Sequence, residues 1–255
     1  MMWWLAGVAL AAQPGPQLAA GDFTTCATDA KGVVRCSGGW KGTGDRVVAL
    51  SVGGFACGRT RNDVVVCWGP DAVEPPDRLF STVDVGRRTA CGVDLDGLVL
   101  CWGSDLGAVP QGRYRAVSVG SGFACGVRND GTVACWGAAS GARLEAPMGS
   151  FTEVAAGGTH ACGVERNGSV RCWGRDVDGA SEAPAGQFRT IGSGDGASCG
   201  LATDGTVACW GSERFGLDQV PAGSWDRLTV GALHACVGRG DEIVCWGADA
   251  AARVP

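Results

Sequence analysis

Cysteine is the residue type with the most chemical potential in this 255-residue chain, which has 14 cysteines and only 2 histidines. A thiol can form a disulfide, ligate a metal or act as a nucleophile. The cysteines fall into seven successive pairs: Cys26 with Cys36, Cys57 with Cys67, Cys91 with Cys101, Cys125 with Cys135, Cys162 with Cys172, Cys199 with Cys209, and Cys236 with Cys245. No cysteine is left over, which favours a disulfide framework over an isolated reactive thiol.

Two alternatives to disulfides stay open. Unpaired cysteines are also among the most buried residue types, so seven pairs of free core cysteines in a cytosolic protein would satisfy the same pattern. Zinc has less support, because the chain lacks C-x2-C spacing and its two histidines supply few further ligands. We expect no metal site, and seven disulfides would indicate an oxidising compartment.

The histidines offer little material for catalysis. His160 and His234 each stand two residues before the first cysteine of a pair, a position that Phe55 and Phe123 fill in other pairs. A histidine base needs a nucleophile and an orienting group within hydrogen-bond reach, and no nucleophile motif accompanies either residue. We therefore interpret both histidines as structural, and we expect no catalytic residue and no cofactor.

The cysteine pairs belong to a repeat. The first members of successive pairs are 31 to 37 residues apart, and each unit has three short segments of alternating apolar residues, the last ending in Cys-Trp-Gly in most units. The unit at residues 114–137 shows this most clearly. Such alternation predicts three strands per unit, and the stretch around Val220 and Pro221 is a candidate for a short fourth strand at the edge.

Turn chemistry predicts that each cysteine pair is bonded. A three-residue loop at 129–131 places Cys125 opposite Cys135, and such loops need a left-handed residue at their third position. Glycine fills that position in five of the six ten-residue pairs, and Asp63 fills it in the sixth. The seventh pair is one residue shorter and has the two-residue turn Gly240-Asp241, which again leaves its cysteines facing each other.

Repeated sheets that cannot bury both faces alone must stack, and radial stacking leaves only short edges. We predict an all-β, seven-bladed β-propeller over residues 13–255, with one disulfide in each blade and with the amino-terminal and carboxy-terminal segments together completing the last unit. Residues 1–12 form a short apolar stretch with the triplet Ala9-Leu10-Ala11 near its end, which predicts a cleavable signal peptide.

The repeat resembles that of the regulator of chromosome condensation family. Gly157-Gly-Thr-His160 and Gly231-Ala-Leu-His234 match its Gly-x-x-His motif, and six Trp-Gly pairs match its closing motif. The resemblance runs from about residue 15 to the end of the chain and implies a seven-bladed propeller. The core cysteines and the short units resemble the secreted bacterial branch of the family, which includes a propeller that inhibits β-lactamases.

The segments that follow each Trp-Gly pair differ in length and charge from unit to unit, as expected for binding loops on a rigid scaffold. Only two aromatic residues break the repeat pattern, Trp40 and Phe215, and Phe215 follows Glu213 and Arg214. Because aromatic and arginine side chains are enriched at binding hot spots, we predict these four residues as partner contacts.

We predict a monomeric, extracytoplasmic propeller that binds a protein partner and is not an enzyme. The net charge of -5 and the lack of a basic run argue against a nucleic-acid partner, and no segment is long and apolar enough to span a membrane. One alternative is a carbohydrate-active enzyme that uses carboxylates in the channel. Another is an intracellular guanine-nucleotide exchange factor, which would have fourteen free thiols.

Overall fold

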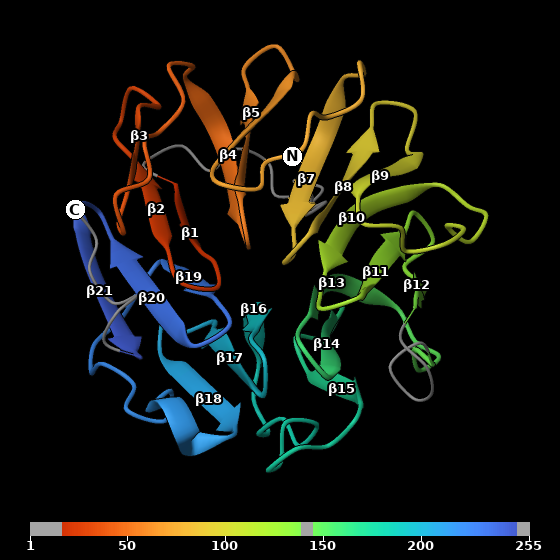
Figure 1. Cartoon of the computed structure of the whole chain (residues 1–255). Coiled ribbons are helices and arrows are strands. Elements are labelled where there is room, and N and C mark those ends of the chain that lie inside the picture. The colour runs from red at the N-terminus through yellow and green to blue at the C-terminus, as the bar shows by residue number, and fades with distance from the viewer. Residues whose placement is uncertain (1–16, 139–144, 249–255) are drawn as a thin grey trace, which may run out of the picture.

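The computed structural model describes residues 17–138 and 145–248, and these form seven antiparallel sheets of three strands each around a central axis (Figure 1). Each sheet is one blade, numbered here in chain order. The strands are β1–β3 (Leu18–Ala20, Thr25–Thr28, Val34–Cys36), β4–β6 (Val47–Val52, Ala56–Thr60, Val65–Trp68), β7–β9 (Phe80–Val85, Thr89–Asp94, Val99–Gly103), β10–β12 (Tyr114–Val119, Phe123–Arg128, Val133–Gly137), β13–β15 (Phe151–Ala156, His160–Glu165, Val170–Gly174), β16–β18 (Phe188–Ser193, Ala197–Ala202, Val207–Gly211) and β19–β21 (Arg227–Val230, His234–Arg239, Glu242–Gly247). The predicted all-β, seven-bladed fold is confirmed.

Each blade has an inner, a middle and an outer strand. The first strand of every blade lines the central channel, and the middle strand pairs with both of its neighbours. We call the connection from inner to middle strand the inner turn, and the connection from middle to outer strand the hairpin turn. Because consecutive strands are antiparallel, inner turns lie at one end of the blades and hairpin turns lie at the other.

All seven predicted disulfides are present, and no cysteine is free. In each blade the two cysteines are directly opposed on the middle and outer strands, as in the pair Cys125 and Cys135, with Cα atoms 4.0 to 4.1 Å apart. The turn chemistry is also confirmed. The third loop residue has a positive φ in all six longer hairpins, including Asp63 at 62°, and Gly240 has a φ of 56° in the two-residue turn between Arg239 and Glu242.

The core lies between adjacent blades. Phe55 of blade 2 packs in one cluster with Phe80 and Trp102 of blade 3, and the other interfaces repeat this arrangement. Within a blade the opening aromatic ring contacts the closing tryptophan, with centroids 5.5 Å apart for Phe80 and Trp102. Stacking of neighbouring sheets therefore supplies the apolar burial that one three-stranded sheet lacks.

Blade 1 packs directly against blade 7, so the described residues close the ring. The Ala20 amide donates a hydrogen bond of 2.9 Å to Thr229 Oγ1, and the Ala232 amide donates one of 3.3 Å to the Gly21 carbonyl. The segments predicted to complete the last unit, and the predicted signal peptide over residues 1–12, lie outside the described residues.

The candidate fourth strand is absent from the described residues, since every sheet has three strands and Val220 and Pro221 belong to none of them. The Val220 amide instead bonds to the Asp218 carbonyl in a tight turn. Pro221 has no amide hydrogen to contribute to a sheet. The described connecting segments therefore add no fourth strand to the blades.

Candidate functional site

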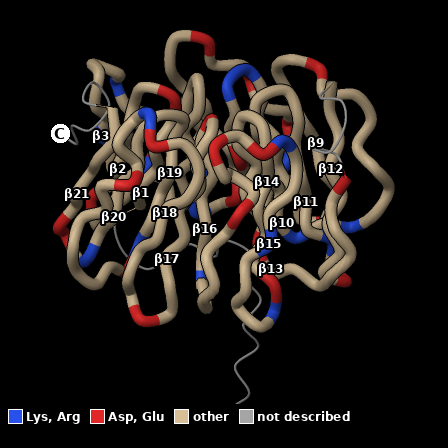
Figure 2. The backbone as a smooth tube through the Cα atoms, turned by 90° about the horizontal axis from the view of Figure 1, so that it is seen from below, with Lys and Arg blue, Asp and Glu red and all other residues tan. Residues whose placement is uncertain are grey.

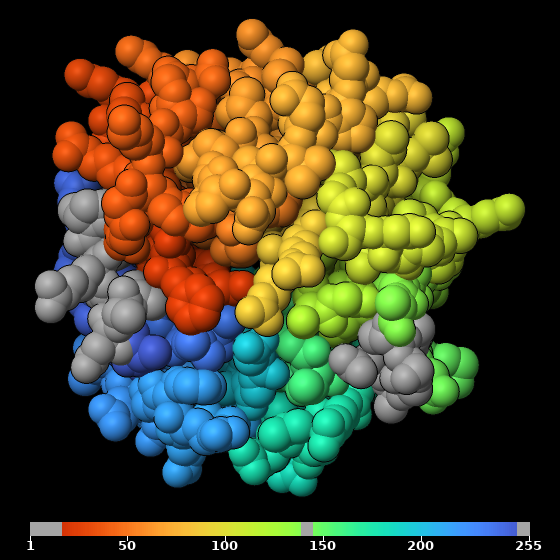
Figure 3. All heavy atoms as spheres, viewed as in Figure 1, coloured from red at the N-terminus to blue at the C-terminus, as the bar shows by residue number. Residues whose placement is uncertain are grey.

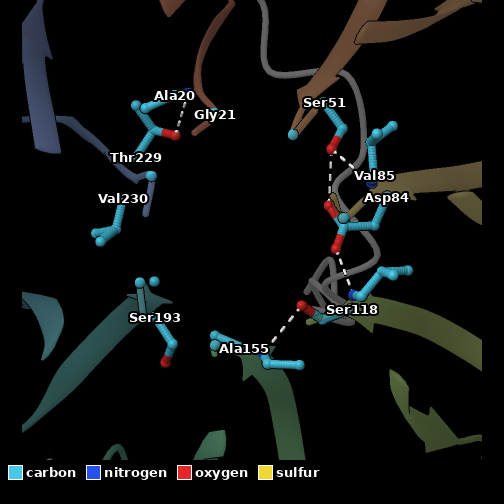
Figure 4. Close-up of a pocket in the computed structure, with 18 of the residues that line it drawn as sticks. Ala20, Gly21, Ser51, Asp84, Val85, Ser118, Ala155, Ser193, Thr229 and Val230 are labelled. Carbon is cyan, nitrogen blue, oxygen red and sulfur yellow. Dashed lines mark hydrogen bonds between the residues drawn. The ribbon is translucent and has the colours of Figure 1, made fainter. Parts of the chain in front are cut away.

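The seven inner strands enclose a central cavity of about 300 Å³ (Figure 4). Its wall carries a repeated contact between blades, made by the inner-strand residue that lies opposite the first cysteine. Where this residue is polar, its side chain accepts a hydrogen bond from a backbone amide of the next blade. The four such bonds are Val85 N to Ser51 Oγ at 3.0 Å, Val119 N to Asp84 Oδ2 at 2.7 Å, Ala156 N to Ser118 Oγ at 3.0 Å, and Ala20 N to Thr229 Oγ1 at 2.9 Å.

Asp84 connects three blades. One carboxylate oxygen accepts from the Ser51 hydroxyl at 2.8 Å, and the other accepts from the Val119 amide. Burial in the channel wall raises the pKa of Asp84 above its usual value, although the hydrogen bonds oppose this rise. Since each oxygen accepts a hydrogen bond from a different neighbouring blade, the carboxyl holds the blades together.

Glu153 is a second carboxyl in the channel wall. Its Oε1 accepts from the Thr190 hydroxyl at 2.8 Å and from the Ile191 amide at 3.3 Å, so it connects blade 5 to blade 6. Burial raises the pKa of Glu153 to about 7. Asp84 and Glu153 thus both have raised pKa values, the feature that the carbohydrate-active alternative requires, and each is bonded to a neighbouring blade.

The two histidines lie between blades and are fully buried. His160 Nε2 is 2.6 Å from Ser198 Oγ of the next blade, and His234 Nε2 is 2.7 Å from Thr25 Oγ1 across the ring closure. Burial lowers the pKa of each histidine to about 4, so both are neutral at pH 7. These contacts support the structural interpretation of both residues.

The repeat explains why histidine occurs at only these two places. Ser198 and Thr25 directly precede the first cysteine of their blades. In the other five blades this position is alanine: Ala56, Ala90, Ala124, Ala161 and Ala235. Histidine is therefore found only where the next blade offers a hydroxyl group.

The loop with most of the predicted contact residues lies on the end of the disc that carries the inner turns, which we call the mouth face. The Ser212 amide bonds to the Gly196 carbonyl of an inner turn, and the short 3-10 helix η2 (Glu213–Phe215) follows directly (Figure 1). Ser212 caps this helix and Gly216 ends it in a left-handed conformation. All three helix residues are exposed, and Phe215 is 38% exposed.

Trp40 differs from Phe215, because it is half-buried in the cluster between blades 1 and 2. Its ring covers Gly69, where an added Cβ would lie 3.1 Å from the ring. Trp40 therefore packs against the following blade, whereas the closing tryptophans Trp102 and Trp136 pack in clusters with the preceding blade. Its role as a partner contact stays a prediction.

The mouth face contains one exposed aromatic residue that the sequence analysis missed, so the prediction that only Trp40 and Phe215 break the repeat pattern was incomplete. Phe23 lies in the inner turn of blade 1 and is 61% exposed. It stands three residues before its cysteine, whereas Phe55 and Phe123 stand two residues before theirs and are buried. A shift of one residue moves a side chain to the other face of a strand, so this count was the signal that could have identified Phe23.

The turn that carries Phe23 meets a turn two blades away. Asp22 lies 3.6 Å from the Arg87 guanidinium of blade 3. Blade 2 lies between these two blades, and its inner turn contains Gly53-Gly54. A Cβ at Gly54 would lie only 2.0 Å from the Arg87 carbonyl oxygen, so glycine is needed where the turns of blades 2 and 3 meet. Figure 3 shows how closely the blades approach one another around the axis.

Residues 114–140, 151–180 and 188–217 match the family described as the regulator of chromosome condensation (RCC1) repeat, and these ranges coincide with blades 4, 5 and 6. Three of the seven blades therefore match the RCC1 repeat. The unmatched blades have the same three-stranded sheet and the same disulfide. The resemblance to the secreted bacterial branch stays a prediction.

Solved structures with the same propeller include receptor ectodomains. The entire ectodomain of the Physcomitrella patens receptor kinase CR4 has a TM-score of 0.78 and 26% identity, over 92% of this chain and 72% of that chain. The CRINKLY WD40 ectodomain of the Arabidopsis thaliana receptor kinase ACR4 has a TM-score of 0.76 and 25% identity, over 92% and 97%. Prp20p from Saccharomyces cerevisiae has a TM-score of 0.61 at 13% identity, over 90% and 71%, which is a likeness of fold alone. No curated protein sequence matches this chain.

Two features are absent from residues 17–138 and 145–248. No helix there is long and apolar enough to cross a membrane. No group of three or more histidine, cysteine, aspartate or glutamate side chains is placed there to hold a metal ion.

We predict that acid weakens the fold through His160 and His234. Their pKa values are lowered to about 4, so the unfolded chain takes up protons first as the pH falls from 6.5, and the stability from burying neutral rings is lost. The loss should reach up to about 3 kcal/mol for each histidine near pH 4. The double variant His160→Gln and His234→Gln should show a flatter decline in unfolding free energy between pH 7.5 and 4.5, and an unchanged decline would contradict this.

We predict that Glu153 weakens the fold as the pH rises, which is opposite to the effect of the two histidines. Its pKa is raised to about 7, so the stability from burying the neutral carboxyl is present below pH 4.5 and is lost as the pH rises through 7. Glu153→Gln keeps an acceptor for Thr190 and should raise the unfolding free energy at pH 8 while changing it little at pH 5. Exposed Glu182→Gln is the control. An equal loss of stability at both pH values in Glu153→Gln would show that the carboxyl is not titrating in this range.

Proposed function

We propose that this chain is an extracytoplasmic binding module that recognises a protein partner through the loops of its mouth face. The observation that carries the proposal is the combination of a framework locked by seven disulfides with connecting segments that differ from blade to blade. Binding residues commonly occupy variable loops on a rigid scaffold, because the scaffold fixes their positions.

The cysteines support a location outside the cytoplasm. Disulfides persist in oxidising compartments and are rare in the cytosol. The described structure has no free cysteine, whereas the intracellular exchange-factor alternative requires fourteen. The two plant structures of similar fold are ectodomains of receptor kinases, which fits the same location. Cleavage of residues 1–12 as a signal peptide is part of this proposal.

Surface chemistry supports a protein partner. Phe215 lies exposed beside Arg214 on η2, and aromatic and arginine side chains are enriched at binding hot spots. Basic positions are scattered among acidic ones along the described chain, with no basic run in this view (Figure 2), whereas nucleic-acid binding needs clustered basic residues.

A second candidate function is supported by one observation. Asp84 and Glu153 line one cavity and both have raised pKa values, as acid and base groups of a hydrolase often do. However, Asp84 is bonded on both oxygens and Glu153 on one, all to neighbouring strands. A channel hydrolase would lose turnover of its glycan substrate in Glu153→Gln.

The binding proposal is tested by capture with the immobilised, oxidised full chain. The proteins offered to it are extracytoplasmic proteins of the source organism and a panel of β-lactamases. Phe215→Ala should weaken capture of the specific partner by at least about tenfold, as truncation of a hot-spot residue does. Leu95→Ala is the matched control, since Leu95 is 57% exposed on a hairpin turn at the opposite end of the disc. Loss of capture in Leu95→Ala but not in Phe215→Ala would show that the partner binds the face of the hairpin turns, which would contradict the proposal.

A further inference from the structure

The central cavity is predominantly acidic. Four carboxyl groups line it, those of Asp22, Asp84, Glu153 and Asp195, against the single basic side chain of Arg87 among the described lining residues. The remaining wall consists mostly of glycine, alanine and valine. A cleft of this kind focuses the potential of its charges, because its walls have a low dielectric constant.

The negative charge is crowded where the cavity opens on the mouth face. Asp22 and Asp195 belong to inner turns of blades 1 and 6, yet they influence each other. Burial raises the pKa of Asp22, the Arg87 guanidinium 3.6 Å away opposes this rise, and the Asp195 carboxylate adds a smaller increase. The Arg87 side chain is itself 66% exposed, so one partly solvated cation faces two carboxyl groups at the opening. The opening therefore favours a further positive charge.

Phe23 lies beside this opening and is not required there by the fold. Its ring is 61% exposed and is among the residues that line the cavity. The equivalent position, three residues before the first cysteine, is glycine in three other blades: Gly54, Gly122 and Gly196. An exposed aromatic face attracts the charged end of a lysine or arginine side chain.

The shape of the cavity also suits a long basic side chain. Valine and alanine side chains of the inner strands lie below the charged opening. Lysine and arginine have an apolar stem and a charged head, so they match a site with both kinds of surface. An acidic partner would meet repulsion from the lining carboxylates, and a small cation would leave the apolar wall and Phe23 unused.

We propose that the opening of the channel receives a lysine or arginine side chain from a loop of the partner protein, held between Asp22 and Asp195 with Phe23 packed against it. This inference rests on the proposed function, because it assigns the centre of the mouth face to the same protein partner.

The test uses two blocked pentapeptides as probes, acetyl-Gly-Gly-Arg-Gly-Gly-amide and its counterpart with glutamate in place of arginine. Each is titrated into the oxidised full chain while backbone amide shifts are followed by NMR. The arginine peptide should shift the amides of the inner turns and bind at least about fivefold more tightly than the glutamate peptide, as expected for a charge-selective site.

Two substitutions locate the site. Asp195→Asn and Phe23→Ser should each weaken binding of the arginine peptide by about threefold or more, as expected for loss of a charge or ring contact. Asp96→Asn is the matched control. It removes the same charge from an exposed hairpin turn of blade 3, which lies on the face of the disc opposite the mouth face. Asp195 is itself exposed, so its variant remains informative if Phe23→Ser fails to fold.

The inference is overturned if the two peptides bind equally, or if Asp195→Asn binds the arginine peptide as well as the wild type does. The proposed function can survive that result. A partner that is lost on Phe215→Ala but retained by Asp195→Asn and Phe23→Ser would sustain the binding module and reject the basic anchor. Failure to capture any partner, together with failure to bind either peptide, would reject both.

Discussion

The disulfide across the middle and outer strands of each blade is the constraint on which the rest of the structure depends. It fixes the register of these strands at one opposed pair, and it buries the first cysteine completely against the inner strand and the next blade. The inner-strand residue opposite that cysteine is thereby aimed at the neighbouring blade. Ser51, Asp84 and Ser118 occupy this place and bond to the next inner strand. In these blades the contact with the next blade therefore forms at the level of the disulfide.

These contacts vary in chemistry while the backbone repeats. Some interfaces use a hydroxyl or carboxyl acceptor, others a buried neutral histidine, and all use apolar packing. The interface that closes the ring uses the same types, a threonine acceptor at Thr229 and the pair His234 with Thr25. Blade 1 therefore meets blade 7 much as any other neighbouring blades meet. Asp84 and Glu153, which bond to neighbouring blades, also line the channel, which connects stability to the surface offered to a partner.

The features that sequence predicted correctly are encoded locally. Gly131 and Gly240 specify hairpin turns of different length, and each leaves its cysteine pair opposed, so strands, register and disulfides follow from spacing alone. The features it missed depend on packing between blades. The exposure of Phe23 follows from a shift of one residue in its turn, and the roles of Asp84 and Glu153 depend on which neighbour the inner strand faces. The sequence shows that Ser198 replaces the alanine found at this position in five other blades. Only the structure shows that its hydroxyl contacts His160 of the preceding blade.

The most direct test of this account is the thiol content of the native chain. Iodoacetamide labelling followed by intact mass and peptide mapping should modify no cysteine before reduction and all 14 after it, with each native link joining the two cysteines of one blade, such as Cys125 to Cys135. Labelled thiols in the native chain, or links between different blades, would contradict the proposal that every blade is locked by its own disulfide and with it the argument for an oxidising compartment.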